Sequence, residues 1–135
     1  MTWLEYHKKS EELAAEAGVA ARADDLKRAR DLYEQAAQYE EKALTDLEPD
    51  KTRTIGITVV SAVSLFYKAA QYKKAELLAH KWLAVSTSPS FSVEQLRGLL
   101  QSIWSEQIRE RAGVCLLYTS PSPRDRTRSR MPSSA

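Results

Sequence analysis

Apolar and small residues recur at intervals of three and four along most of the chain, which is the spacing of one face of an amphipathic helix. The clearest stretch contains Leu26, Ala29, Leu32, Tyr33, Ala36, Ala37, Ala43, Leu44 and Leu47. Charged residues fill most of the positions between them. The pattern therefore predicts an all-α fold of about five helices, arranged as antiparallel hairpins.

Signals at the helix starts and ends divide this pattern. Thr2 and Glu5 have the spacing of a capping box, so a first helix is expected to follow and to end at Gly18 or near Ala23. The acidic pair at residues 24–25 is expected to begin a second helix, because acids complement the positive end of a helix dipole.

The later boundaries follow from the same rules. Pro49 is expected to end the second helix. A fourth helix is expected over residues 72–85, followed by a turn that contains Pro89. Ser92 and Gln95 have the spacing of a second capping box and predict the start of a fifth helix.

Residues 55–67 carry opposing signals. They are rich in β-branched residues, which favour a strand. The segment continues into Ala69 and Ala70 without a breaking residue, and a single strand would have no partner. We therefore predict a third helix here.

An internal repeat appears when the chain is shifted by 46 residues, since every aligned position below is apolar or aromatic. The positions Ala17, Ala20, Ala23, Leu26, Ala29, Tyr33 and Ala36 align with Val63, Phe66, Ala69, Tyr72, Ala75, Ala79 and Trp82. Two similar hairpins are therefore predicted.

This spacing resembles the tetratricopeptide-repeat family over about residues 10–88, with Ala29 and Ala75 at the position where the paired helices cross most closely. The period is longer than the ~34 residues of that family. The resemblance implies a binding surface on the first helix of each hairpin, with Arg22, Ser64, Tyr67 and Lys68 as partner-binding residues. A closed antiparallel bundle is the alternative.

The last residues carry a different signal. Residues 115–125 and 129–135 resemble, in order, two segments of a translated adapter used to prepare DNA sequencing libraries, with residues 126–128 in place of its barcode. We therefore expect a native helical domain over residues 1–113, truncated from a longer protein, and a non-native, disordered tail over residues 114–135.

This tail changes the charge of the chain. The full sequence has a net charge of +2, and without the tail's four arginines and one aspartate it would be −1. Composition therefore gives no reason to expect nucleic-acid binding. The single cysteine, Cys115, lies in the tail, so no disulfide framework is expected. No signal peptide or membrane-spanning stretch is recognised, and we expect a cytoplasmic protein without membrane contact.

Candidate chemistry is sparse. The two histidines, His7 and His80, lack partners at metal-ligand spacing, and no nucleophile, glycine-rich loop or paired carboxylate suggests catalysis. We therefore expect no enzyme, cofactor or metal in the visible chain. The expected function is a protein-interaction or scaffold module that binds a partner peptide or helix. The alternatives are a structural or regulatory bundle and an accessory domain of a longer protein, which could be an enzyme.

Self-association is a further expectation. Leu99, Ile103 and Trp104 follow the apolar stripe of the fifth helix. A contiguous apolar face of this kind often marks an interface. We therefore expect that homo-oligomers, if they form, use this face.

Overall fold

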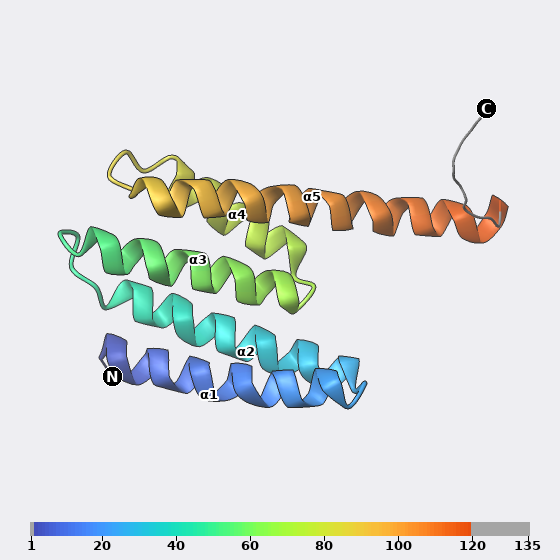
Figure 1. Ribbon diagram of the computed structural model, residues 1–135, viewed down its shortest axis with the longest axis horizontal. Helices are drawn as coiled ribbons and strands as arrows, with labels where there is room; N and C mark the ends of the chain where they lie inside the picture. The colour runs from blue at the N-terminus through green and yellow to red at the C-terminus, as the bar shows by residue number, and fades with distance from the viewer. Residues whose placement is uncertain (1, 120–135) are drawn as a thin grey trace. The chain divides into compact units, whose positions relative to one another are not determined.

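The computed structural model describes residues 2–119, with the side chains of residues 2–113. All regular structure in this part of the chain is α-helical. The helices are α1 (Trp3–Arg22), α2 (Leu26–Thr45), α3 (Thr52–Lys68), α4 (Tyr72–Leu83) and α5 (Ser90–Thr119). Consecutive helices from α1 to α4 pack as antiparallel neighbours (Figure 1). The all-α prediction is confirmed, and residues 55–67 are helical as predicted.

The chain divides into two compact units, residues 1–104 and residues 105–135. The first unit contains α1 to α4 and residues 90–104 of α5. In the second unit the helical backbone of α5 continues to Thr119, beyond the expected end of the domain at residue 113. The rest of the expected non-native tail, residues 120–135, lies outside the described residues. The adapter origin of the tail stays a prediction.

The first helix begins and ends with local hydrogen bonds. The Glu5 N–H donates to the Thr2 hydroxyl at 3.3 Å, and the Thr2 N–H donates to the Glu5 carboxylate at 2.8 Å. The predicted capping box is therefore present. Helix α1 passes through Gly18 and is capped at Ala23, so the later of the two expected ends is correct.

The second predicted capping box is wrong. Helix α5 already begins at Ser90, and Ser92 lies buried in its first turn. The Ser92 hydroxyl donates to the carbonyl of Pro89 at 2.8 Å instead of capping a following amide. The Pro89 carbonyl also accepts the N–H groups of Ser92 and Val93, both at 3.1 Å. The chain can therefore enter the helix one turn earlier than Ser92 suggested.

The turns that close the two hairpins have the same geometry. Asp24, between α1 and α2, has φ 63°, and Ala70, between α3 and α4, has φ 61°. The next residue donates its N–H five positions back in each case, from Asp25 to Ala20 and from Gln71 to Phe66, both at 2.9 Å. These are two Schellman motifs separated by the repeat length of the sequence. The predicted pair of similar hairpins is therefore present in the fold.

Small residues occupy buried positions in both hairpins. Ala29 and Ala75, the predicted crossing residues, are buried, with 3% and 0% exposure. The largest fully buried apolar side chains come from α3 and α5 and are Val59, Val63, Phe66, Leu96 and Ile103. The helices of the first unit thus share one apolar core.

The three residues expected to support self-association differ in exposure. Ile103 is fully buried in the core, so it is not available to a second molecule. Leu99 is half-buried, and only Trp104 is substantially exposed. The amphipathic stripe of α5 covers the core of its own chain, which is what such stripes most often do.

A buried polar contact joins α1 to α2. His7 Nδ1 lies 3.0 Å and 3.2 Å from the two carboxylate oxygens of Glu40, which is 1% exposed. The His7 ring stacks on Trp3, with centroids 4.9 Å apart. The Trp3 indole N–H donates to Thr58 of α3 at 3.1 Å. This network fixes the first half of α1 against the next two helices.

Candidate functional site

Two of the predicted partner-binding residues lie near the same tyrosine. Lys68 of α3 places its Nζ 5.7 Å from the ring centroid of Tyr33 in α2. Arg22 Nη1 and Tyr33 Oη both lie within 4 Å of the position that a Cβ of Gly18 would occupy. The three side chains therefore come from three successive helices. We call Arg22, Tyr33 and Lys68 the basic face.

Gly18 of α1 lies beside Arg22 and Tyr33, and the space there would also admit a Cβ in ordinary van der Waals contact. A side chain at this position would lie 3.4 Å from Arg22 Nη1 and 4.0 Å from Tyr33 Oη. Glycine weakens a helix interior by about 0.5–1 kcal/mol relative to alanine. Gly18 lies inside α1 and is not the helix end that the sequence offered.

The basic face carries unneutralised positive charge. Arg22 and Lys68 are exposed, and neither forms an ion pair with another described residue. By contrast, Lys27 pairs with Asp31 at 3.4 Å, and Lys74 pairs with Glu34 at 2.9 Å. The two cations of the face are thus available to an external anion, and the Lys68 charge is also attracted to the Tyr33 ring.

The other two predicted residues lie beside this face on α3. The Tyr67 ring packs 5.8 Å from that of Tyr72, tilted by 52°, and is half-buried against the core. Ser64 is half-buried and precedes Lys68 by one helical turn, so both occur on the same side of α3. Tyr33, which sequence reasoning did not place in the site, lies near both Arg22 and Lys68.

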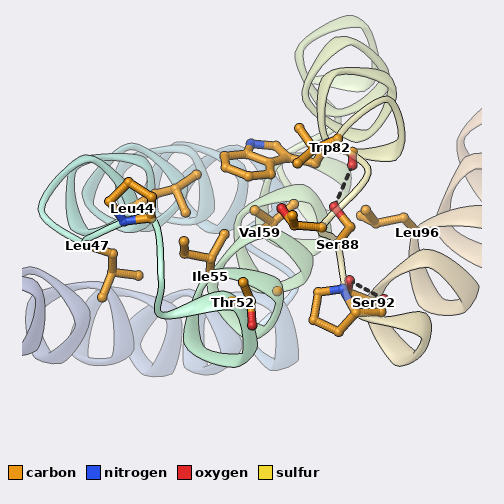
Figure 2. Close-up of a pocket in the computed structure, with 14 residues that line it drawn as sticks. Leu44, Leu47, Thr52, Ile55, Val59, Trp82, Ser88, Ser92 and Leu96 are labelled. Carbon is orange, nitrogen blue, oxygen red and sulfur yellow. Dashed lines mark hydrogen bonds between the residues drawn. The ribbon is translucent and has the colours of Figure 1, made fainter.

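A second feature is an apolar cleft of about 310 Å³ in the first unit. It lies where α2 and α4 end and α3 and α5 begin. Figure 2 shows Leu44 and Leu47 at one end and Leu96 and Ser92 at the other. The lining residues are Leu44, Leu47, Pro49, Thr52, Ile55, Gly56, Val59, Trp82, Val85, Thr87, Ser88, Pro89, Ser92 and Leu96.

Five lining residues have polar side chains, namely Thr52, Trp82, Thr87, Ser88 and Ser92. No lining residue is charged. The Ser88 hydroxyl donates to the Trp82 carbonyl at 2.8 Å, and the Ser92 hydroxyl donates to that of Pro89 (Figure 2). Trp82 Nε1 is buried without a hydrogen-bond partner among the described residues. An unpaired buried N–H costs about 1–3 kcal/mol, so Trp82 contributes packing rather than polar stability.

One wall of the cleft is built by close backbone approach. A Cβ at Gly56 of α3 would lie 3.2 Å from the Pro89 ring and from Ser92 Cβ. Beside this contact, the Arg53 guanidinium lies 5.4 Å from the Phe91 ring centroid. These two contacts join the starts of α3 and α5. The sequence gives no signal for the cleft, because its walls depend on residues that are far apart along the chain.

No described residues form a candidate centre for metal chemistry. Among the described residues, no group of three histidine, cysteine or carboxylate side chains could hold a metal ion. His80 lies 3.8 Å from Glu76, which also accepts the Trp104 indole N–H at 3.0 Å. In the same part of the chain, no helix is long and apolar enough to cross a membrane.

Comparisons of the chain with models of protein families, with curated proteins and with solved structures find no match. The architecture is therefore described by its own helices, as five helices of which the first four pack in sequence.

Proposed function

We propose that this chain is a protein-interaction module that binds an acidic segment of a partner protein at the basic face. The observation that carries the proposal is the placement of Arg22 and Lys68 around Tyr33 without an intramolecular anion. Arginine and lysine bind carboxylates through charge-assisted hydrogen bonds, which are the stronger class of hydrogen bond. A peptide with two acidic residues fits this distribution of charge.

The resemblance to tetratricopeptide repeats supports this proposal. It implies a binding surface on the first helix of each hairpin, and Arg22 and Lys68 belong to α1 and α3, which are these helices. The equal turns at Asp24 and Ala70 support a duplicated hairpin. Tyr67 and Ser64 extend the surface along α3, where a bound segment would make further contacts.

The test uses fluorescent peptides that differ in charge. An acidic peptide library with two carboxylates at varied spacing is titrated against the whole chain, alongside a library of the same length with lysines in their place. Fluorescence anisotropy reports the binding. We expect the acidic peptides to bind and their affinity to fall as salt rises, because exposed charge pairs are screened.

Matched variants locate the binding. Arg22→Ala and Lys68→Ala are each expected to weaken the acidic peptide about fivefold, which corresponds to about 1 kcal/mol for an exposed ion pair. Lys27→Ala removes the same charge from a lysine that pairs with Asp31 and should leave the affinity unchanged. Equal binding of acidic and basic peptides, or equal losses in Lys68→Ala and Lys27→Ala, would reject the proposal.

A further inference from the structure

We infer that the apolar cleft between α2, α3, α4 and α5 is a binding site for an uncharged, apolar small molecule. This inference goes beyond the peptide-binding proposal and does not depend on it. The cleft volume of about 310 Å³ falls at the lower end of the range of ligand pockets, about 300–1,000 Å³.

The chemistry of the lining selects a neutral ligand. A carboxylate, phosphate or ammonium group would lose its water without meeting an opposite charge, because no lining side chain is ionisable. The hydroxyl hydrogens of Ser88 and Ser92 already bond to backbone carbonyls. Leu44, Leu47 and Ile55, which are all half-buried, offer only apolar contact. The remaining polar groups of the lining are the Thr52 and Thr87 hydroxyls and the Trp82 indole N–H, and most of the lining is apolar. The binding energy must therefore come mainly from burial of apolar surface.

The shape of the cleft favours a small molecule over a peptide helix. A helix that docks by its apolar face needs a groove that stays open over several turns of 5.4 Å. Here the segments that connect α2 to α3 and α4 to α5 line the cleft with Leu47, Pro49, Val85 and Pro89. A site bounded by connecting segments rather than by parallel helix faces suits a compact ligand.

The walls are held in place before a ligand arrives. Gly56 allows the backbone of α3 to contact Pro89, and no other residue could do so without displacing its neighbours by a few tenths of an ångström. Arg53 and Phe91 add a cation–π contact between the same two helices. Pre-formed walls reduce the cost of binding, because less conformational entropy is lost.

The cleft is separate from the basic face. Thr52 lines the cleft at the start of α3, whereas Lys68 ends the same helix. The rise of 1.5 Å per residue places these two residues about 24 Å apart along the helix axis. The two sites can therefore be tested independently.

The experiment titrates the whole chain with two fluorescent probes of similar size. N-phenyl-1-naphthylamine is neutral, and 1-anilinonaphthalene-8-sulfonate carries a negative charge. We expect the neutral probe to saturate one site with a Kd of about 10–200 μM, and the sulfonate to bind at least about tenfold more weakly. Heteronuclear NMR should show shifts at the Gly56 amide and the Trp82 indole N–H.

Variants show whether the probe occupies the cleft. Val85→Trp adds a large ring to the cleft wall and should weaken the neutral probe at least about tenfold. Val19→Trp adds the same ring to an exposed position on α1 and should leave binding unchanged. Thr87→Trp, on the exposed segment before α5, replaces Val85→Trp if that variant fails to fold.

The outcomes are distinct. Absence of saturable binding, equal binding of the two probes, or undiminished binding to a folded cleft-filled variant would overturn the inference. Lys68→Ala should leave the neutral probe unaffected. Failure of the peptide-binding proposal would therefore not resemble failure of this one.

Discussion

Replacing His7 with phenylalanine should destabilise the first unit by about 2–4 kcal/mol. The substitution keeps an aromatic ring on Trp3 but removes both ring nitrogens. Glu40, which is 1% exposed, would then keep a carboxylate in the interior without the group that faces both of its oxygens. The loss of stability would come from the carboxylate that is left buried without a partner, since the aromatic ring stacked on Trp3 is retained.

The magnitude follows from the burial of the two groups. Removing one partner of a fully buried ion pair typically costs about 3–5 kcal/mol. The His7 side chain is 25% exposed, so water can partly replace it and the expected loss is smaller. His7 Nε2 also lies 3.3 Å from Glu11, but that carboxylate is 68% exposed, so losing this contact adds little.

Urea unfolding followed by far-UV circular dichroism measures the change. His80→Phe is the matched control, because His80 is half-exposed and lies 3.8 Å from the carboxylate of Glu76. It should cost less than about 0.5 kcal/mol. Glu40→Leu supplies the second arm of a double-mutant cycle, and in that background His7→Phe should be nearly neutral.

The reasoning would be refuted by a small or additive effect. If His7→Phe costs no more than His80→Phe, the buried carboxylate does not depend on its histidine. If the cost is the same with and without Glu40, the loss comes from packing and the coupling energy is zero. In either case the network would be a consequence of the helix crossing and not a cause of it.

Three further changes test the turns, the core and the first helix. Ala70→Gly should stabilise the fold by about 1 kcal/mol in a thermal melt, because glycine adopts the φ of 61° without steric cost, whereas Ala69→Gly should not. Ala75→Leu should destabilise it by about 1–3 kcal/mol through overpacking at a fully buried position, and no loss would show that α3 and α4 do not cross there. The Thr2 backbone N–H donates to the Glu5 carboxylate and lowers its pKa. The ionised Glu5 therefore stabilises the fold above the ordinary pKa of 4.5, and this stabilisation is lost as pH falls through the lowered pKa. Between about pH 6 and about pH 3, the Tm of Glu5→Gln should therefore decrease less than the Tm of the original chain. An equal decrease in both proteins would contradict this account.

Local features of the structure were predictable from sequence because they depend on residues within one or two helical turns. The Thr2 capping box, the all-helical content and the burial of the small residues Ala29 and Ala75 are of this kind. The repeat was visible because equal turns need equal patterns of apolar residues around them. Ser92 misled the same reasoning, since its hydroxyl had an alternative acceptor in Pro89.

The sequence by itself determined the helices, their order and the pairing of the first four into two similar hairpins. Periodicity and helix-end signals are local, and they carry this information in any context. Only the tertiary structure decided which exposed residues meet. The distance from Lys68 to Tyr33 depends on the crossing of α2 and α3, and the cleft depends on the approach of Gly56 to Pro89. The tertiary structure also decided that Ile103 is buried within its own chain. The apolar stripe of a helix predicts that this face is covered, but it does not identify the element that covers it.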